Sequence, residues 1–235
     1  MIERAVEHGC RDIMQVGDWG YTWPGELDRM RQLDRWLADA GIHMWFIDGN
    51  HDNFTDLKKR KAFGADHVTD LTTNITYIPR GHIWEWAGAT CMAMGGAFSI
   101  DQDARVEGVS WWPEELISYA DLERAADNLD KLEAAGRTID VFFSHDCPEG
   151  VGRLETHLEL TSKQMGMDYK LDESSRANRR ALWLVVERAK PAKLFHGHYH
   201  FAYWDTLKWD GHAMLVAGLD CDGTKESFTI LEFKE

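Results

Sequence analysis

Short apolar runs alternate along the chain with longer stretches whose apolar residues recur at helical spacing. One such stretch, residues 26–41, carries its apolar side chains at Leu27, Met30, Leu33 and Leu37. This spacing predicts a helix that ends at Gly41, because glycine is common just after the last helical residue. Apolar runs at 12–16 and 43–47 flank the helix and predict strands. The three segments together predict a βαβ unit.

The rest of the chain continues this alternation. Further helices are predicted over residues 2–8, 121–135 and 175–189. Further strands are predicted within 75–79, 82–88, 90–100, 139–144 and 193–197, and residues 202–218 predict two antiparallel strands joined at a turn. Because apolar strands alternate with helices, the pattern predicts an α/β fold in which helices cover the sheet strands on both faces.

Length and composition favour one domain and limit the partners. The chain has 235 residues, 44% of them hydrophobic, with no linker-like run and no repeat, so one domain over residues 1–235 is predicted. It carries 26 basic and 40 acidic residues, a formal charge of −14. This charge repels a duplex backbone, so duplex nucleic acid is not expected to be a tight partner. No feature of the sequence indicates an oligomeric state.

The cysteines and the N-terminal residues indicate a cellular compartment. The four cysteines, Cys10, Cys91, Cys147 and Cys221, are far apart and form no CxxC pair. Neither a zinc knuckle nor a disulfide framework is therefore indicated. The first ten residues lack the apolar core of a signal peptide, and no stretch approaches a membrane span. A cytoplasmic protein without a membrane partner is expected.

Four predicted strands end in polar clusters. These are "VGDWG" at 16–20, "DGNHD" at 48–52, "SHDCP" at 144–148 and "HGHYH" at 196–200. In an open α/β sheet, loops from different strands converge at the carboxyl ends of the strands. The clusters are therefore expected to meet, bringing together Asp18, Asn50, His51, His145, His198 and His200.

This set of side chains offers carboxylate, amide and imidazole donors and no thiol. Such donors suit a hard to borderline divalent metal ion, Mn, Fe, Zn or Ni. Each cluster by itself also has a plain interpretation, because "GD" is common in turns and "SHD" at the end of a strand. In 196–200, a continuing strand would place the three histidines on one side. The joint occurrence at four strand ends favours the metal site.

The same motifs resemble those of the calcineurin-like metallophosphoesterases. Their motif order is D-x-H, G-D-x-x, G-N-H-[DE], a later strand-end His, and G-H-x-H, and this chain matches the last four as "GDWG", "GNHD", "SHD" and "GHYH". "GGAFSID" and "SWWPEE" further resemble a subgroup common among bacterial and phage members. The resemblance covers essentially the whole chain and implies a layered α-β-β-α sandwich.

The resemblance also implies roles for individual residues. Asp18 would bridge two metal ions, with Asn50, His145 and His198 completing one site and His200 belonging to the other. His51 would be a general acid or contact a phosphate oxygen, and Asp52 would orient its imidazole and raise its pKa. The two ions would activate water and polarise the phosphoryl oxygen.

The D-x-H motif is the departure from this pattern. It belongs on a strand before the first helix, which places it upstream of Met1, so the first strand is expected to be missing. The one D-x-H in the chain is Asp210-Gly211-His212, and Asp-Gly there predicts a hairpin turn. Either the sequence starts late and the domain is N-terminally truncated, or the molecule has a reduced site that binds one ion.

The sequence thus predicts a metal-dependent phosphoesterase acting on phosphodiester or phosphomonoester bonds of small nucleotide-like substrates. The alternative is a non-catalytic metal- or nucleotide-binding relic of the same fold. Two features have two interpretations each. Trp19, Tyr21 and Trp23 would either stack a base or pack in the core, and Arg105 would either clamp a phosphate or lie on the surface.

Overall fold

The computed structural model describes residues 2–166 and 169–233, which form a mixed α/β protein with six α-helices and two mixed, mostly parallel sheets. The four-stranded sheet has the order β1 (Asp12–Val16), β2 (His43–Ile47), β4 (Ile75–Tyr77), β3 (Thr69–Asp70). The six-stranded sheet has the order β5 (Ile83–Trp86), β6 (Ala89–Met94), β7 (Val141–Ser144), β8 (Lys193–His196), β10 (His212–Gly218), β9 (Tyr203–Trp209). The helices are α1 (Ile2–Glu7), α2 (Leu27–Ala40), α3 (Phe54–Lys59), α4 (Tyr119–Ala134), α5 (Gly152–Met165) and α6 (Tyr169–Ala189).

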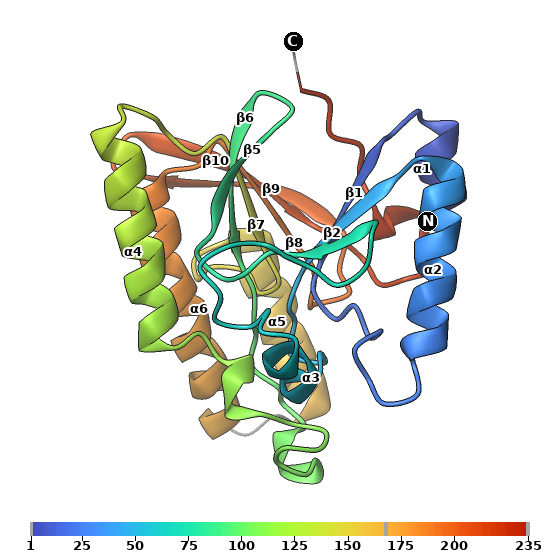
Figure 1. The fold of residues 1–235 in the computed structure, drawn as a ribbon. Coiled ribbons are helices and arrows are strands. Elements are labelled where there is room, and N and C mark those ends of the chain that lie inside the picture. The colour runs from blue at the N-terminus through green and yellow to red at the C-terminus, as the bar shows by residue number, and fades with distance from the viewer. Residues whose placement is uncertain (1, 167–168, 234–235) are drawn as a thin grey trace.

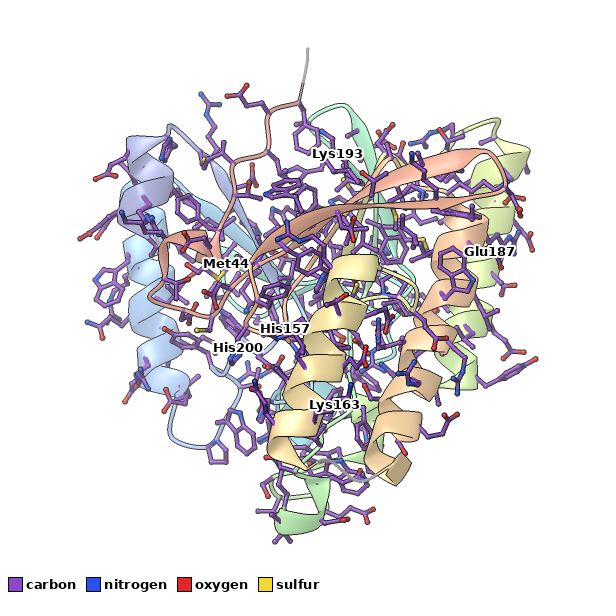
Figure 2. The ribbon with its side chains drawn as sticks, turned by 180° about the vertical axis from the view of Figure 1, so that it is seen from behind. Met44, His157, Lys163, Glu187, Lys193 and His200 are labelled. Atoms are coloured by element: carbon purple, nitrogen blue, oxygen red, sulfur yellow. The ribbon has the colours of Figure 1, made fainter. Side chains whose placement is uncertain are left out.

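The two sheets lie between outer helices. Figure 1 shows α1 and α2 on one side of the molecule and α4 and α6 on the other, with the strands between them. Apolar side chains are buried in three successive groups. One lies between α2 and the four-stranded sheet, the second between the two sheets, and the third between the six-stranded sheet and its helices. Met44, on β2, is buried in the first group, and Figure 2 shows it among the strands, whereas Glu187 lies on the outer helix α6.

The parallel strands of both sheets follow from the alternation of strands and helices. In the four-stranded sheet, β1, β2 and β4 are parallel; in the six-stranded sheet, β6, β7, β8 and β10 are parallel. The antiparallel strands β3, β5 and β9 pair at sheet edges. Parallel strands point their carboxyl ends the same way, so the loops that follow them gather on one side of each sheet.

Most predicted elements are confirmed. The expectation that helices cover the strands on both faces is wrong, because on one face each sheet packs against the other sheet. The other differences have local causes. Asp210 and Gly211 both have positive φ, 43° and 76°, which is the backbone of a two-residue hairpin turn between β9 and β10, as predicted. Helices α3 and α5 were not predicted. Asn53 caps α3 by accepting a hydrogen bond from the backbone N–H of Asp56, and asparagine before a helix is a start signal that the sequence analysis did not use. Helix α6 begins at Tyr169, earlier than the predicted 175.

Strand β1 is an edge strand of its sheet. Across the described ranges 2–166 and 169–233, it pairs with β2 and with no other strand. A groove of about 610 Å³ runs along it, lined by β1 itself, by the C-terminal segment 227–233 and by Phe143 and Phe195 of the other sheet. The four-stranded sheet therefore has an open side where it meets the six-stranded sheet.

No helix within the described part of the chain combines the length and apolar character needed to cross a bilayer. The four cysteines are all free thiols.

A fully buried arginine connects the two sheets. Arg80 follows β4, and its guanidinium donates to Asp48 Oδ2 at 2.6 and 2.9 Å and to Asp121 Oδ2 at 3.1 Å. It also donates to the carbonyl oxygens of Glu114 at 2.8 Å and Leu116 at 2.7 Å. Asp48 ends β2 in one sheet, while Asp121 lies in α4, which packs on the other. This network holds the start of "GNHD" against the loop that precedes α4.

Replacing Arg80 with methionine is expected to destabilise the fold strongly. The variant fills a similar volume but leaves the Asp48 carboxylate buried without its cationic partner, which typically costs about 3–5 kcal/mol. Urea denaturation should show a lower midpoint at an unchanged slope. Arg29→Met is the matched control, because the Arg29–Glu26 pair is exposed (69% for Arg29) and should change the unfolding free energy by about 1 kcal/mol or less. Equal effects of the two substitutions would contradict this assignment.

Candidate metal centre

Four strand ends from both sheets carry the predicted ligands. Asp18 follows β1 and Asn50 follows β2 in the four-stranded sheet, whereas His145 follows β7 and His198 follows β8 in the six-stranded sheet. All four strands are parallel members of their sheets, so these residues lie at carboxyl ends. The site is therefore built across the line where the two sheets meet.

Three donor atoms converge at this line. The Nε2 atom of His145 lies 3.0 Å from Asn50 Oδ1 and 3.4 Å from Asp18 Oδ2. The other ring nitrogen, Nδ1, lies 2.7 Å from the backbone oxygen of Val16, which can only accept a hydrogen bond. Nδ1 therefore carries the proton, and this contact fixes the tautomer that leaves Nε2 able to bind a cation.

Two glycines make room for the convergence. A Cβ at Gly17 would lie 2.1 Å from His145 Nδ1, and a Cβ at Gly49 would lie 2.2 Å from Asp18 Oδ1 and 2.8 Å from His145 Nε2. All three distances are too short for any other residue to fit at position 17 or 49 without moving the donors. The glycines of "VGD" and "DGN" are thus required by close approach of the side chains around them.

Three predicted ligands have an unusual backbone. Asp18, His198 and His200 have positive φ values of 58°, 68° and 49°. Such conformations are strained for residues other than glycine and cluster at functional sites. The backbone of these histidines also corrects the expectation that a strand continues through residues 196–200. Strand β8 ends at His196, so the chain does not stay extended through "HGHYH", and the three histidines do not alternate along one strand. The His196 ring instead lies 2.6 Å from the hydroxyl of Tyr203, in the core.

His198 and His200 lie at the groove along β1. The ring of His198 meets that of His145 edge to face, with centroids 5.1 Å apart. His200 is exposed, and Figure 2 shows it below the strands, between α2 and α5. Both histidines line the groove together with Asp18 and His145. The structure thus gathers these four predicted ligands on one surface, with Asn50 buried beside His145.

The charges of the site are strongly coupled. Burial alone would lower the pKa of His145, but the Asp18 carboxylate outweighs it and raises the pKa to about 9. Burial opposes ionisation of Asp18, but His145 outweighs it and lowers the pKa of Asp18. Burial lowers the pKa of His198 to about 4. In the free protein, the proton on His145 therefore balances Asp18, and a bound cation would replace that proton.

Asp52 has a different role from the one expected. Its carboxylate is fully buried and accepts backbone N–H groups from Gly49 at 2.8 Å, Asp18 at 3.1 Å, Gly20 at 3.2 Å and Trp19 at 3.4 Å. Burial and the neighbouring Asp18 charge raise the pKa of Asp52 to about 6. The expectation that Asp52 orients the His51 ring is therefore wrong, because its oxygens are taken by the two loops after β1 and β2. Asp52 holds those loops together.

The His51 ring contacts an arginine instead. The Nη2 atom of Arg105 lies 2.8 and 2.9 Å from the two ring nitrogens of His51. Burial lowers the pKa of His51, and the positive charge of Arg105 adds to this effect, so the expected increase in its pKa is also wrong. The Arg105 side chain is only 10% exposed, which excludes the interpretation as a surface residue. It lies where an anion bound beside His51 would meet it.

The aromatic residues after Asp18 divide between packing and positioning. Trp19 is 6% exposed and stacks on Phe46 with ring centroids 4.3 Å apart, so it packs in the core. The indole N–H of Trp23 donates to the backbone oxygen of His51 at 2.9 Å. Trp19, Tyr21 and Trp23 nevertheless line a second hollow of about 330 Å³, together with Arg29.

Asp18, Asn50 and His145 offer two oxygens and one nitrogen around a common point, which fits one divalent ion. Gly17 and Gly49, which leave room for these atoms, also fit this interpretation. Within residues 2–166 and 169–233, no group of three or more His, Cys, Asp or Glu side chains is placed to hold a metal ion. The converging set contains only one carboxylate and one imidazole beside an amide.

Comparison of the chain with models of protein families and with curated proteins finds no match. Assignment of the site therefore depends on its geometry and on the motifs in the sequence.

Two residues that the sequence analysis did not single out reach the site. Ser99 and Glu115 are buried, and Ser99 accepts a hydrogen bond from the side-chain amide of Asn50 at 2.9 Å. They lie in "GGAFSID" and "SWWPEE", the two stretches that were noted only for their resemblance to a subgroup. The sequence does not set these two residues apart, because Asp101, Ser110 and Glu114 are further polar residues of the same stretches.

Gly49→Ala is expected to abolish or weaken metal binding while the fold persists. The added Cβ must displace Asp18 Oδ1 and His145 Nε2, and changes of this kind typically lower metal affinity by about 10- to 100-fold. Calorimetric titration with Mn²⁺ measures the affinity, and circular dichroism checks the fold. Gly152→Ala is the control, since its nearest contact would be 3.7 Å away. Unchanged Mn²⁺ affinity in Gly49→Ala would place the ion elsewhere.

Proposed function

We propose that this chain is a metal-dependent phosphoesterase of the calcineurin-like type, with the layered α-β-β-α arrangement of that family. The observation that carries the proposal is the convergence of Asp18, Asn50 and His145 donor atoms at the carboxyl ends of strands from two sheets. A purely structural role would not account for a carboxylate, an amide oxygen and an imidazole directed at one point between strained loops.

The bound group would be a divalent ion such as Mn, Fe, Zn or Ni, held by Asp18, Asn50 and His145 with His198 beside them. When bound, such an ion polarises a phosphoryl oxygen and lowers the pKa of bound water. His145 contributes a neutral Nε2 because Val16 holds the proton on Nδ1. Asp18 contributes a carboxylate that stays ionised, since its pKa is lowered in the folded protein.

His51 would act on the leaving group. It is exposed at the mouth of the site, next to Arg105, and its backbone N–H donates to Asp18 Oδ1 at 2.7 Å. Arg105 disfavours the imidazolium form, but the negative charge of a bound phosphate ester would offset Arg105 and favour it. The imidazolium can then donate its proton to the departing alkoxide. Trp23 holds the His51 backbone in place for this step.

Small nucleotide-like esters are the substrates that this site suits best. The net charge of −14 disfavours a long polyanion. The hollow of about 330 Å³ lined by Trp19, Tyr21 and Trp23 lies beside the Asp18 loop and offers aromatic surface for one base. Both phosphodiesters and phosphomonoesters of this size fit the proposal.

A second candidate is a non-catalytic protein that binds one metal ion or a nucleotide through the same residues. The converging set of one carboxylate, one amide oxygen and one imidazole, which suffices for one ion, favours it. A single ion cannot stabilise the attacking and leaving oxygens equally. The two candidates differ in turnover and not in metal binding.

The open edge of β1 supports a proposal about the D-x-H motif. An apolar strand placed along this edge would pair with β1, fill the groove of about 610 Å³ and bring an Asp and a His to the side of Asp18. His200 lines the groove but is not one of the donor groups that converge at His145. Beside the added strand, it would be a ligand of a second metal ion. In this proposal, the described residues form one half of a two-ion site.

His51→Ala is expected to keep the metal and lose turnover. Proton donation to the leaving group contributes about 10²- to 10⁴-fold, so kcat should fall by that factor while Mn²⁺ affinity is unchanged. Hydrolysis should be measured on an alkyl diester, such as a cyclic nucleotide, and on bis-p-nitrophenyl phosphate, whose leaving group needs little protonation. His67→Ala, an exposed histidine, is the control. If alkyl diester hydrolysis survives in His51→Ala, His51 is not the acid; if the unmodified protein hydrolyses neither ester, the non-catalytic candidate takes the lead.

Extending the N-terminus by an apolar strand of about six residues that carries Asp-x-His is expected to raise both stability and metal stoichiometry. The strand would pair the free edge of β1 and bury apolar surface, at about 0.8 kcal/mol per buried methylene. Melting temperature and Mn²⁺ stoichiometry are the measurements. A matched extension with Ala-x-Ala in place of the motif should raise the melting temperature alone. If the Asp-x-His extension changes neither the melting temperature nor the Mn²⁺ stoichiometry, the groove does not accept such a strand.

A further inference from the structure

A chain of buried hydrogen bonds leads from the predicted ligand Asn50 to a carboxylate outside the metal centre. The Asn50 Nδ2 atom donates to Ser99 Oγ at 2.9 Å, and Ser99 Oγ donates to Glu115 Oε2. The second oxygen, Glu115 Oε1, accepts the backbone N–H of Trp112 at 3.2 Å. Asn50, Ser99 and Glu115 are each 1–2% exposed, so water does not compete with these contacts.

Counting protons along this chain gives it a direction. A serine hydroxyl has one hydrogen to donate and lone pairs to accept, whereas an ionised carboxylate can only accept. The Ser99 hydrogen must therefore point to Glu115, and the Ser99 oxygen must accept from Asn50. The NH₂ end of the Asn50 amide is then turned to Ser99, which leaves Oδ1 facing His145 Nε2 at 3.0 Å. The reversed amide would present two N–H donors to a cation.

We propose that Glu115, acting through Ser99, is a positioning residue that sets the orientation of the Asn50 amide and thereby makes Asn50 a metal ligand. The inference rests on the proposed metal site and deepens it. The sequence segment that carries Glu115, the short helix Pro113–Glu115, is thus coupled to a metal ligand at the end of β2.

The surroundings of Glu115 are consistent with a carboxylate whose role is to accept hydrogen bonds. Burial raises the pKa of Glu115 to about 7, against the opposing effect of the hydrogen bonds from Ser99 and the Trp112 backbone. Its nearest cation, Arg105 Nη1, is 3.8 Å away and is mainly engaged with Asp101 and His51. A buried carboxylate with so little neutralisation disfavours folding, and both of its oxygens are used only as acceptors.

Glu115→Gln is the sharpest test, because it keeps the shape and reverses the hydrogen bonding. The glutamine oxygen can still accept from the Trp112 N–H, but its NH₂ group must then donate to Ser99. The Ser99 hydrogen would turn to Asn50 and draw Oδ1 away from His145. At pH 8, where Glu115 is ionised in the unmodified protein, calorimetry should show Mn²⁺ affinity about 10- to 100-fold lower in the variant, at an unchanged or higher melting temperature.

Two comparisons separate this orientation effect from a general effect of charge. Glu114→Gln removes the neighbouring carboxylate, which pairs with Lys58 on the surface, and should leave Mn²⁺ affinity unchanged. In a Ser99→Ala background, where the chain is already broken, Glu115→Gln should lower the affinity no further. An equal decrease with and without Ser99 would mean that Glu115 acts through its charge, and would overturn the proposal.

A readout without metal keeps this inference separate from the proposed function. In a His145→Ala apo-protein, where no imidazolium donates to Asn50 Oδ1, nuclear Overhauser contacts should run from the Asn50 NH₂ protons to the β protons of Ser99. Adding Glu115→Gln to this background should remove these contacts. Contacts that remain on Ser99 in the double variant would refute the positioning role. If the unmodified protein binds no Mn²⁺ while these contacts are lost as expected, the proposed function fails and the amide orientation by Glu115 stands.

Discussion

The buried ion pair between Arg80 and Asp48 is the contact on which the arrangement of the site depends. Asp48 is the last residue before "GNHD", and its backbone oxygen also accepts the N–H of Gly96 at 2.9 Å, in the loop after β6. A Cβ at Gly95 would lie 2.5 Å from the Asp48 carboxylate, so the two loops touch. Because Arg80 additionally binds the carbonyl oxygens around Glu114 and the start of α4, one guanidinium fixes the β2 loop, the β6 loop and the segment that contains Glu115 relative to one another.

A second buried acid completes this support from the other side. The Asp52 carboxylate accepts hydrogen bonds from backbone N–H groups of the loops after β1 and β2, and these bonds fix the position of the Asp18 backbone. The site therefore consists of polar side chains on loops that two buried carboxylates, Asp48 and Asp52, hold in place. This explains how residues with strained backbones, such as Asp18, are maintained, since the strain of about 1–3 kcal/mol is offset by contacts outside the metal centre.

Much of the fold was predictable from the sequence, because hydrophobic periodicity reports burial directly. Residues 26–41 and the apolar runs beside them gave the first βαβ unit, and Asp-Gly at 210–211 gave the hairpin. The proximity of Asp18 and Asn50 also followed, since the strand ends of one parallel sheet share a side, but this rule does not explain why His145 meets them from a second sheet. The partners of Asp52 and His51 did not follow. The family resemblance implied that these two contact each other, whereas the fold brings Gly20 to Asp52 and Arg105 to His51 from distant segments. The helix at 152–165 was missed because its apolar spacing is weak.

The open edge of β1 also bears on how copies of the chain meet in solution. An unpaired strand edge offers N–H and C=O groups to any other extended segment, and proteins commonly protect such edges with charge. In this chain the β1 edge is protected by the charge of the whole molecule, because copies with a formal charge of −14 repel one another at neutral pH. The isoelectric point is about 5.2, so mild acid removes this repulsion while leaving the edge exposed. Electrostatic repulsion between copies is therefore weakest in mild acid, where the unpaired edge of β1 has only its own side chains to protect it.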